Sequence, residues 1–335
     1  MIRPFLNLNT MLSLKKHIGL LGIGLALWQC GPADEIPAVD IHIERLEQTL
    51  MNLSDTAQVH AFLVKHEDVT RAFFRAYPDD PAFISYLTQL TQHPDTRKLH
   101  DQTQAYFGDL TDIETQLEQA FGRIKSHYPN FRPPRVVTLF SGLQNDVYVS
   151  DSLMVIALEA FVGPKALFRP QQPDYILRRY EKESLVPTLI RLLADSYAKS
   201  NTGDRTLLND MIYFGKTFEF TQTMLPEVPP HRIIDYADTT YQQTWYAQDL
   251  VWAHFVDHQL FFELNPRTKE KYIGERPAVP EIGPACPGRI GQWVGWRIVN
   301  AYRTENPKVT FVDIMENKEA NQILQKSAYR GQVGE

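Results

Sequence analysis

All the segments with strand character fall within one short stretch of this chain, which limits the folds open to it. The β-branched run over 135–140 follows two prolines. Two further apolar runs, 147–149 and 154–157, flank the turn residues 150–152, as in a β-hairpin. Strands that cluster in this way, without alternating with helices, favour an α+β fold over a doubly wound sheet. We therefore predict a predominantly helical α+β fold with a small antiparallel or mixed sheet.

The segments on both sides of this stretch have the three-to-four spacing of apolar residues that is typical of amphipathic helices. Pro81 and Pro94 are placed to open two of these helices. The longer helices are predicted at 43–53, 111–124, 184–197, 207–225, 239–263 and 289–302. We expect either one compact domain over 36–335, or a helical region over 36–129 beside an α+β region over 130–335.

The N-terminal residues have the pattern of a secretory signal. Three positive charges and no acidic residue precede an apolar run over 18–28, and the charges are Arg3, Lys15 and Lys16. This run is shorter than the roughly 20 apolar residues that a membrane span requires. It therefore indicates a signal peptide over 1–29 and not a transmembrane helix.

Cys30 directly follows this predicted signal peptide, and residues 27–30 resemble a bacterial lipobox. Gln29 stands where Gly, Ala or Ser is usual. We predict that the mature chain begins at Cys30, carries lipid on that cysteine, and has a short tether over 30–35. The alternative is an ordinary signal peptide with a chance cysteine.

The charge of the mature chain excludes one class of partner. Loss of the three N-terminal positive charges changes the formal net charge from −6 to −9. An acidic chain without a basic cluster is a poor candidate for binding nucleic acid. The only other cysteine is Cys286, so acylated Cys30 leaves no intramolecular disulfide. We expect an exported protein of the cell envelope, tethered to the inner or outer membrane by its lipid.

Five motifs follow one another along about two hundred residues of the chain. They are TLFSG at 138–142, ALEAFVG at 157–163, DMIYFGK at 210–216, GRIGQWVG at 288–295 and ILQKSAY at 323–329. This ordered set resembles the gliding-motility lipoprotein GldB family of the Bacteroidetes. The resemblance implies a lipid-anchored, non-catalytic component of the gliding-motility machinery, which such bacteria link to type IX secretion. Its partners would be other envelope proteins, whose assembly or stability it supports.

The region from 136 onward also resembles putative zinc peptidases, and this implies a zincin-like helix pair. In those proteins an HExxH helix supplies two zinc ligands and the general base, and a second helix supplies a glutamate. The alignment places Arg191 and Asp195 at the histidine positions, Leu192 at the base and Phe214 at the third ligand. Arginine has no lone pair to offer a metal. The resemblance thus implies a degenerate site, a pseudoenzyme, and no cofactor besides the lipid.

The charged residues of the first of these helices have two interpretations. Arg191, Asp195 and Lys199 are four residues apart, so they can form a solvated ladder on one helix face. Alternatively, Arg191 forms an ion pair at the position that the zinc occupies in the peptidases, with Asp195 or with an acid of a neighbouring helix such as Glu219.

His254 and His258 form the weak alternative metal site, because two histidines four apart share one helix face. The alternative function is an envelope peptidase, or a ligand-binding protein that uses the remodelled cleft. The aromatic stripes around Trp252 and Trp296 predict core packing. Gly291 and Gly295 lie four apart on their helix, so small residues there predict a close helix contact.

Overall fold

A computed structural model describes residues 36–332 of the chain. The predicted signal peptide over 1–29, Cys30 and the tether over 30–35 lie outside the described residues. Within the described range, no helix combines the length and the apolar character needed to cross a bilayer.

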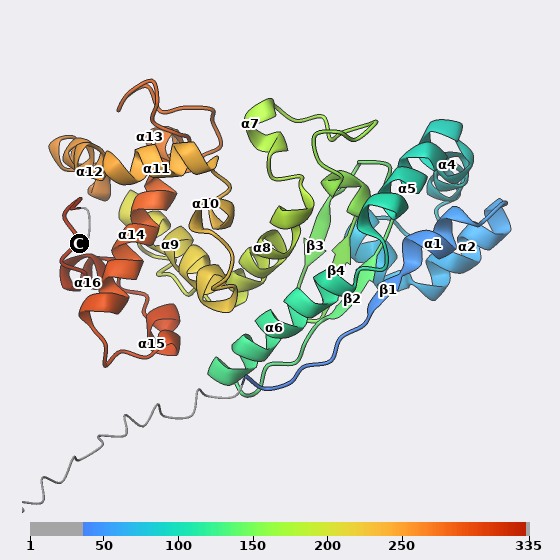
Figure 1. Cartoon of the computed structure of the whole chain (residues 1–335), viewed down its shortest axis with the longest axis horizontal. Helices are drawn as coiled ribbons and strands as arrows, with labels where there is room; N and C mark the ends of the chain where they lie inside the picture. The colour runs from blue at the N-terminus through green and yellow to red at the C-terminus, as the bar shows by residue number, and fades with distance from the viewer. Residues whose placement is uncertain (1–35, 333–335) are drawn as a thin grey trace, which may run out of the picture. The chain divides into compact units, whose positions relative to one another are not determined.

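The strands form a four-stranded mixed sheet in the order β1-β2-β4-β3 (Figure 1). Its strands are β1 (Ile43–Arg45), β2 (Arg135–Thr138), β3 (Val147–Val149) and β4 (Leu153–Ile156). β2 is parallel to both β1 and β4, whereas β3 pairs with β4 in antiparallel fashion. The predicted strand after the two prolines and the predicted hairpin are therefore confirmed.

β1 corrects the expectation that every strand lies in one stretch, because residues 43–45 were predicted to be helical. Ile43 pairs with Val136 in the sheet, and its N–H donates to Glu114 Oε1 at 2.8 Å. Three residues are too few to show the alternation of apolar and polar side chains that marks a strand. The helical spacing of Leu46 and Leu50, which belong to α1, therefore extends the predicted helix back to residue 43.

The helices before β2 begin close to their predicted starts. Asp55 and Asp80 cap two of them with their carboxylates, and Pro81 and Pro94 occupy first-turn positions as predicted. These elements are α1 (Leu46–Met51), α2 (Thr56–Lys65), α3 (Glu67–Val69), the π-helical turn η1 (Thr70–Phe74), α4 (Pro81–Gln92), α5 (Pro94–Phe107) and α6 (Thr111–His127).

The chain after β4 is helical. It contains η2 (Leu158–Phe161), α7 (Asp174–Leu177), α8 (Lys182–Leu193), η3 (Ala194–Ser196), α9 (Leu207–Met224), α10 (Pro230–Ile233) and α11 (Asp238–Tyr246). It continues with α12 (Gln248–Asp257), η4 (Leu260–Phe262), α13 (Pro266–Ile273), α14 (Ile290–Glu305), α15 (Phe311–Glu316) and α16 (Ala320–Lys326). The structure is thus predominantly helical, as predicted.

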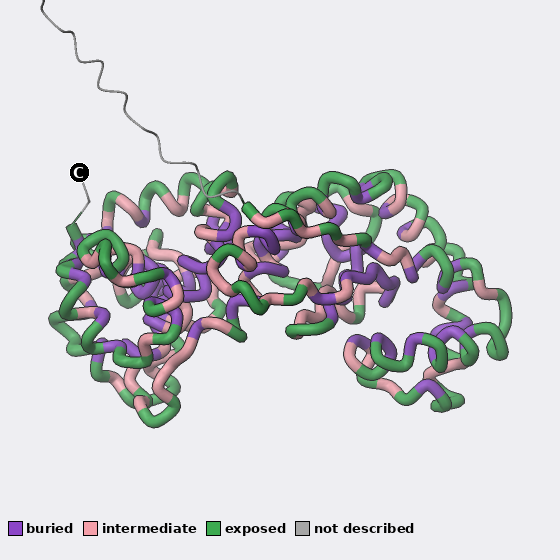
Figure 2. The backbone as a smooth tube through the Cα atoms, turned by 90° about the horizontal axis from the view of Figure 1, so that it is seen from below, coloured by how far each residue is buried: buried purple, intermediate pink, exposed green. Residues whose placement is uncertain are grey.

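The two faces of the sheet contribute to two different apolar clusters. Val136, Met154 and Ile156 belong to the larger cluster, which includes side chains of α6, α8, α9 and α14. Val137 and Val155 belong to a smaller cluster with α1, α2 and α4. Because side chains of a strand alternate between faces, this division follows from the strand register. Figure 2 shows the buried residues gathered in the interior and the exposed ones along the outside of the tube.

α9 and α14 pack together along their length and form the centre of the helical part. A Cβ atom at Gly295 would lie 1.8 Å from Met211 O, and one at Gly215 would lie 2.3 Å from Gly295 O. The two backbones can approach this closely only because these positions have no side chain. The predicted close helix contact at Gly295 is therefore confirmed.

The single helix predicted over 239–263 is wrong, because the segment forms α11, α12 and η4. The side chain of buried Gln248 donates to Trp245 O at 2.9 Å and accepts from Tyr329 OH at 2.9 Å. A side chain that hydrogen-bonds to a helix carbonyl competes with the backbone N–H that would otherwise bond to it, and this favours the break between α11 and α12. Gln259 has a φ of +52°, which starts η4 in a new direction.

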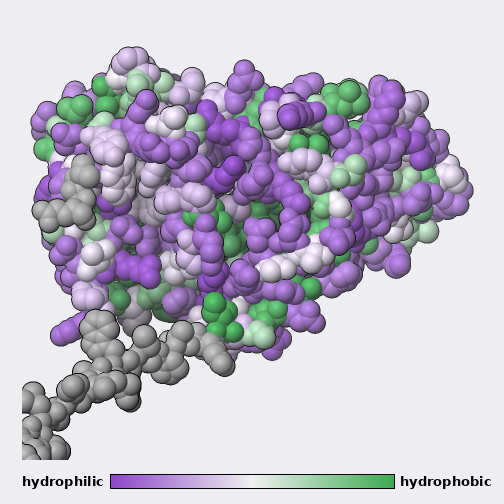
Figure 3. Space-filling view, in the orientation of Figure 1, coloured by the Kyte–Doolittle hydropathy of each residue, from purple (hydrophilic) through white to green (hydrophobic). Residues whose placement is uncertain are grey.

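The visible surface is mainly hydrophilic, with small and separated hydrophobic patches (Figure 3). The most exposed large apolar side chains include Tyr246, Leu250 and Phe262, on α11, α12 and η4.

Candidate functional site

The side chains aligned with zinc ligands do not converge on one point. Arg191 Nη2 donates to Asp235 Oδ2 at 3.2 Å, whereas Asp195 Oδ1 accepts from Tyr213 OH at 2.8 Å. Phe214 is half-buried and packs against the larger apolar cluster, and Leu192 is also half-buried. The zincin-like helix pair itself stays a prediction from the sequence.

Arg191 forms an ion pair, as the second interpretation predicts, but the partner is Asp235. The predicted partners Asp195 and Glu219 are wrong, because neither forms a salt bridge or hydrogen bond with Arg191. α8 ends at Leu193 and continues as the tighter turn η3, so Asp195 is not one α-helical turn from Arg191. For the same reason the predicted ladder through Lys199 does not form.

Glu219 belongs to the contact between α9 and α14. Its carboxylate is buried and accepts from Trp296 Nε1 at 3.0 Å and from Arg303 Nη1 at 3.0 Å.

Five charged side chains form what we call the arginine–carboxylate centre. It comprises Arg179, Arg191, Asp235, Glu275 and Arg289. Arg179 lies 2.6 Å from Glu275 and 3.7 Å from Asp235, and Arg289 lies 3.3 Å from Glu275. Asp235 therefore faces two guanidinium groups, and so does Glu275. Three positive charges against two negative charges leave the centre with an excess of one positive charge.

Two residues of the centre have a strained backbone conformation, and two hydrogen bonds join their segments. Asp235 and Arg289 both have a φ of +59°, in the left-handed region that non-glycine residues rarely adopt. Their segments are joined twice, because Arg289 Nη2 donates to Ile234 O at 2.7 Å and Tyr236 OH donates to Gly288 O at 2.6 Å. Such strained conformations persist where many surrounding contacts enforce them, and they often occur at functional sites.

The electrostatics of the centre keep Glu275 ionised. Burial raises the pKa of Glu275, but the hydrogen bond from Arg179 and the charge of Arg289 outweigh burial and bring the pKa below its ordinary value. Burial lowers the pKa of Arg289. A cavity of about 130 Å³ borders the centre. With its positive excess, the centre would repel a divalent cation and is better suited to a small anion.

His254 and His258 are adjacent, with ring centroids 4.2 Å apart. His254 Nε2 is 3.0 Å from Tyr272 OH, and His258 Nδ1 is 3.0 Å from His254 O. Burial and the charge of His258 lower the pKa of His254. Between residues 36 and 332, no group of three metal-ligating side chains has the spacing of a metal site.

Sequence reasoning missed most of this centre. Arg289 lies inside the GRIGQWVG motif, so the motif marked its position but not its role. Asp235 and Glu275 lie in segments between helices, and their convergence with Arg191 depends on tertiary packing. A positive φ at a residue other than glycine has no reliable signal in the sequence.

Comparison with protein families identifies a relationship for nearly the whole chain. The family model described as gliding motility protein GldB matches residues 31–331, which include all five motifs. Neither the curated proteins nor the solved structures contain a match to the chain.

Proposed function

The chain belongs to the family of the gliding motility protein GldB, and from this premise we propose that it is a lipid-anchored, non-catalytic component of the gliding-motility machinery. Its role is to support the assembly or stability of other envelope proteins, in connection with type IX secretion. The family match over residues 31–331 carries the proposal.

The geometry at the aligned zinc positions supports a non-catalytic role. Arg191 pairs with Asp235, and Asp195 is engaged by Tyr213. A catalytic zinc requires about three ligands and an open position for water. Here a guanidinium occupies the position of one ligand, and an ion pair fixes its orientation.

The signal pattern that ends at Cys30 supports the anchor, and the family match begins at the next residue. A single acyl chain binds membranes only marginally, so stable attachment requires more than one chain on the cysteine.

Deletion of the gene in a gliding host tests the motility role. We expect the deletion strain to lose colony spreading and the wild-type gene to restore it. A strain complemented with Cys30→Ser should make the protein without retaining it in the membrane fraction, and should spread poorly. Normal spreading of the clean deletion strain would contradict the motility role. Unchanged membrane retention and mass of the Cys30→Ser protein would contradict the anchor.

Metal analysis of the purified chain tests the absence of catalysis. We expect no stoichiometric zinc and no change in melting temperature on addition of a chelator. One zinc per chain, lost on chelation together with a peptidase activity, would favour the alternative site at His254 and His258. His254→Ala and His258→Ala would then have to abolish that zinc binding.

A further inference from the structure

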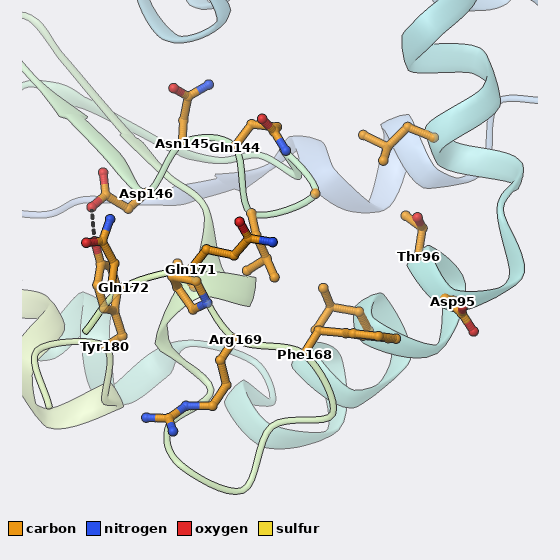
Figure 4. A pocket seen from close by; sticks show the side chains of 16 residues that line it. Asp95, Thr96, Gln144, Asn145, Asp146, Phe168, Arg169, Gln171, Gln172 and Tyr180 are labelled. Atoms are coloured by element: carbon orange, nitrogen blue, oxygen red, sulfur yellow. Dashed lines mark hydrogen bonds between the residues drawn. The ribbon is translucent and has the colours of Figure 1, made fainter. Parts of the chain in front are cut away.

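A polar cleft of about 700 Å³ lies beyond the carboxyl ends of β2 and β4 (Figure 4). The loop 142–146, which follows β2, forms one wall, and the segment 168–172 forms another. Residues of α4 and α5 complete the cleft. The carboxyl ends of parallel strands are a common place for ligand binding, and this volume is in the usual range of ligand sites.

A buried glutamate holds the loop wall in place. Glu159 Oε1 accepts from Ser141 N at 2.7 Å and lies 3.0 Å from Ser141 Oγ. Ser141 Oγ in turn donates to Asn145 O at 2.8 Å. Gly142 and Leu143 both have positive φ values, so the loop makes a tight turn that these bonds hold. A preformed wall reduces the entropy lost when a ligand binds.

Four side-chain amides line the cleft, and they are those of Gln144, Asn145, Gln171 and Gln172. Within the described residues, none of these four amide groups has a hydrogen-bond partner in the protein. Gln144, Gln171 and Gln172 are exposed. A side-chain amide presents donors and an acceptor in one plane, so it can bind a hydroxyl group or an acetamido group in either role.

The cleft also offers an apolar contact. The side chain of Phe168 is 38% exposed and lies at the cleft, where Leu143 is a neighbouring lining residue. An aromatic face carries partial negative charge, so it attracts the weakly positive C–H groups on one side of a sugar ring.

The charges at the cleft favour a neutral ligand. Asp146 accepts from Tyr180 OH at 2.9 Å and Asp95 pairs with Lys98 at 3.1 Å, so both carboxylates are already engaged. Arg169 is the only cationic lining residue in the described part of the chain, and Figure 4 shows its guanidinium extending away from Gln144 and Asn145.

The lining also argues against an extended peptide as the ligand. One common way for a peptide to bind in extended form is to add to the free edge of a sheet through its backbone. None of the described residues of β2, β3 or β4 lines the cleft, which is built from loops and helices.

From these contacts we propose that the cleft is a binding site for a neutral oligosaccharide. The free amides bind its hydroxyl or acetamido groups, and Phe168 packs against the apolar face of a ring. This site is independent of the motility role, because it rests on the geometry of the cleft and not on the family.

Titration calorimetry tests the site, using the full-length lipidated chain in a zwitterionic detergent without a sugar headgroup. The probes are chitotriose, maltotriose and a hexapeptide of glycine and serine. We expect at least one trisaccharide to bind saturably at millimolar concentration or below. Gln171→Ala and Phe168→Ala should each weaken that binding about fivefold, since each removes one hydrogen bond or one ring contact.

Two matched variants control for general effects. Gln325→Ala and Phe262→Ala remove the same side-chain types from exposed positions on α16 and η4, and they should leave the affinity unchanged. All four residues are exposed, so we expect the melting temperatures to remain close to that of the wild type. Absence of saturable binding by both trisaccharides would overturn the proposal. Equal affinities in all four variants, or binding of the hexapeptide alone, would also overturn it.

Discussion

The two halves of the protein build their interiors differently. In the sheet half, residues 36–163, large apolar side chains fill the space between helices and sheet, as Leu50, Leu87 and Val155 do. In the helical half, residues 174–332, α9 and α14 approach through glycines, and charged side chains are buried between elements. The first interior depends mainly on side-chain volume, whereas the second also depends on backbone spacing and on partners for its buried charged groups.

Lys216 illustrates the second kind of interior. Its side chain is buried, and its Nζ donates to Lys199 O at 2.8 Å, to Met315 O at 3.1 Å and to Asn317 O. Burial lowers the pKa of Lys216 to about 8. One amine thus joins α9 to two distant segments of the chain, in a place where an apolar side chain would leave the carbonyls without a donor.

The largest expected effect is that of a single added methyl group in the helical half. Gly295→Ala should lower the free energy of unfolding by more than about 3 kcal/mol, because the new Cβ would overlap the backbone of Met211. Leu50→Ala removes three carbons from the sheet half and should cost about 2–5 kcal/mol. Gly283→Ala is the control, since its Cβ would have no neighbour within 4 Å. Urea denaturation measures all three. A Gly295→Ala protein as stable as the wild type would remove the distinction between the halves.

The sheet half contains two buried acids, Glu47 and Glu159, and Glu159 predicts a pH dependence. Burial raises its pKa from 4.5 to about 7, against the opposing effect of the Ser141 hydrogen bonds. The folded protein therefore holds this proton more tightly than the unfolded chain. The resulting stabilisation is fully present below about pH 4.5 and is lost as the pH rises through about 7, on the order of 3 kcal/mol.

Urea denaturation of the wild type and of Glu159→Gln across this pH range isolates that contribution. The stability of the wild type relative to the variant should fall between pH 5 and pH 8. A constant difference between the two proteins would show that Glu159 titrates near its unfolded pKa.

A smaller effect is expected for Arg191→Ala in the arginine–carboxylate centre. The variant leaves buried Asp235 with only Arg179, at 3.7 Å, and should lose about 2 kcal/mol of stability. Arg71→Ala, which breaks an exposed pair with Glu67 in the sheet half, should lose less than about 0.5 kcal/mol. Thermal melting measures the stability of both variants. Equal losses of stability would mean that the ion pair of Arg191 contributes no more than an exposed one.

In both halves the sequence predicts the elements that carry a strong local signal and misses those that depend on distant contacts. The strand after the prolines and the hairpin carry β-branched residues and turn residues, which act locally. α6, α9 and α14 have long periodic patterns. β1 has only three residues, and its partner lies some ninety positions away.

The candidate sites depend on contacts that no local pattern records. Asp235, Glu275 and Arg289 meet through the packing of loops, and two of them adopt positive φ values. The free amides of the cleft come from two loops, 142–146 and 168–172, that no local sequence pattern predicts to lie side by side. Sequence reasoning instead placed a degenerate metal site at Arg191, Leu192, Asp195 and Phe214; of these four, Arg191 belongs to the centre, whereas Asp195 bonds to Tyr213 and Phe214 packs against the larger apolar cluster.

The short strand β1 also determines how the protein would bear mechanical load. The segment leading to β1 runs along α6 (Figure 1), where Glu118 accepts from Ile41 N–H and Glu114 accepts from Ile43 N–H. Tension applied to the chain from its N-terminal end would pull along β1, in line with its parallel partner β2. Such a pull loads the bonds between the strands together, in shear, and does not peel them apart one by one. The edge of the sheet, braced by α6, would then resist that force before any helix is stretched.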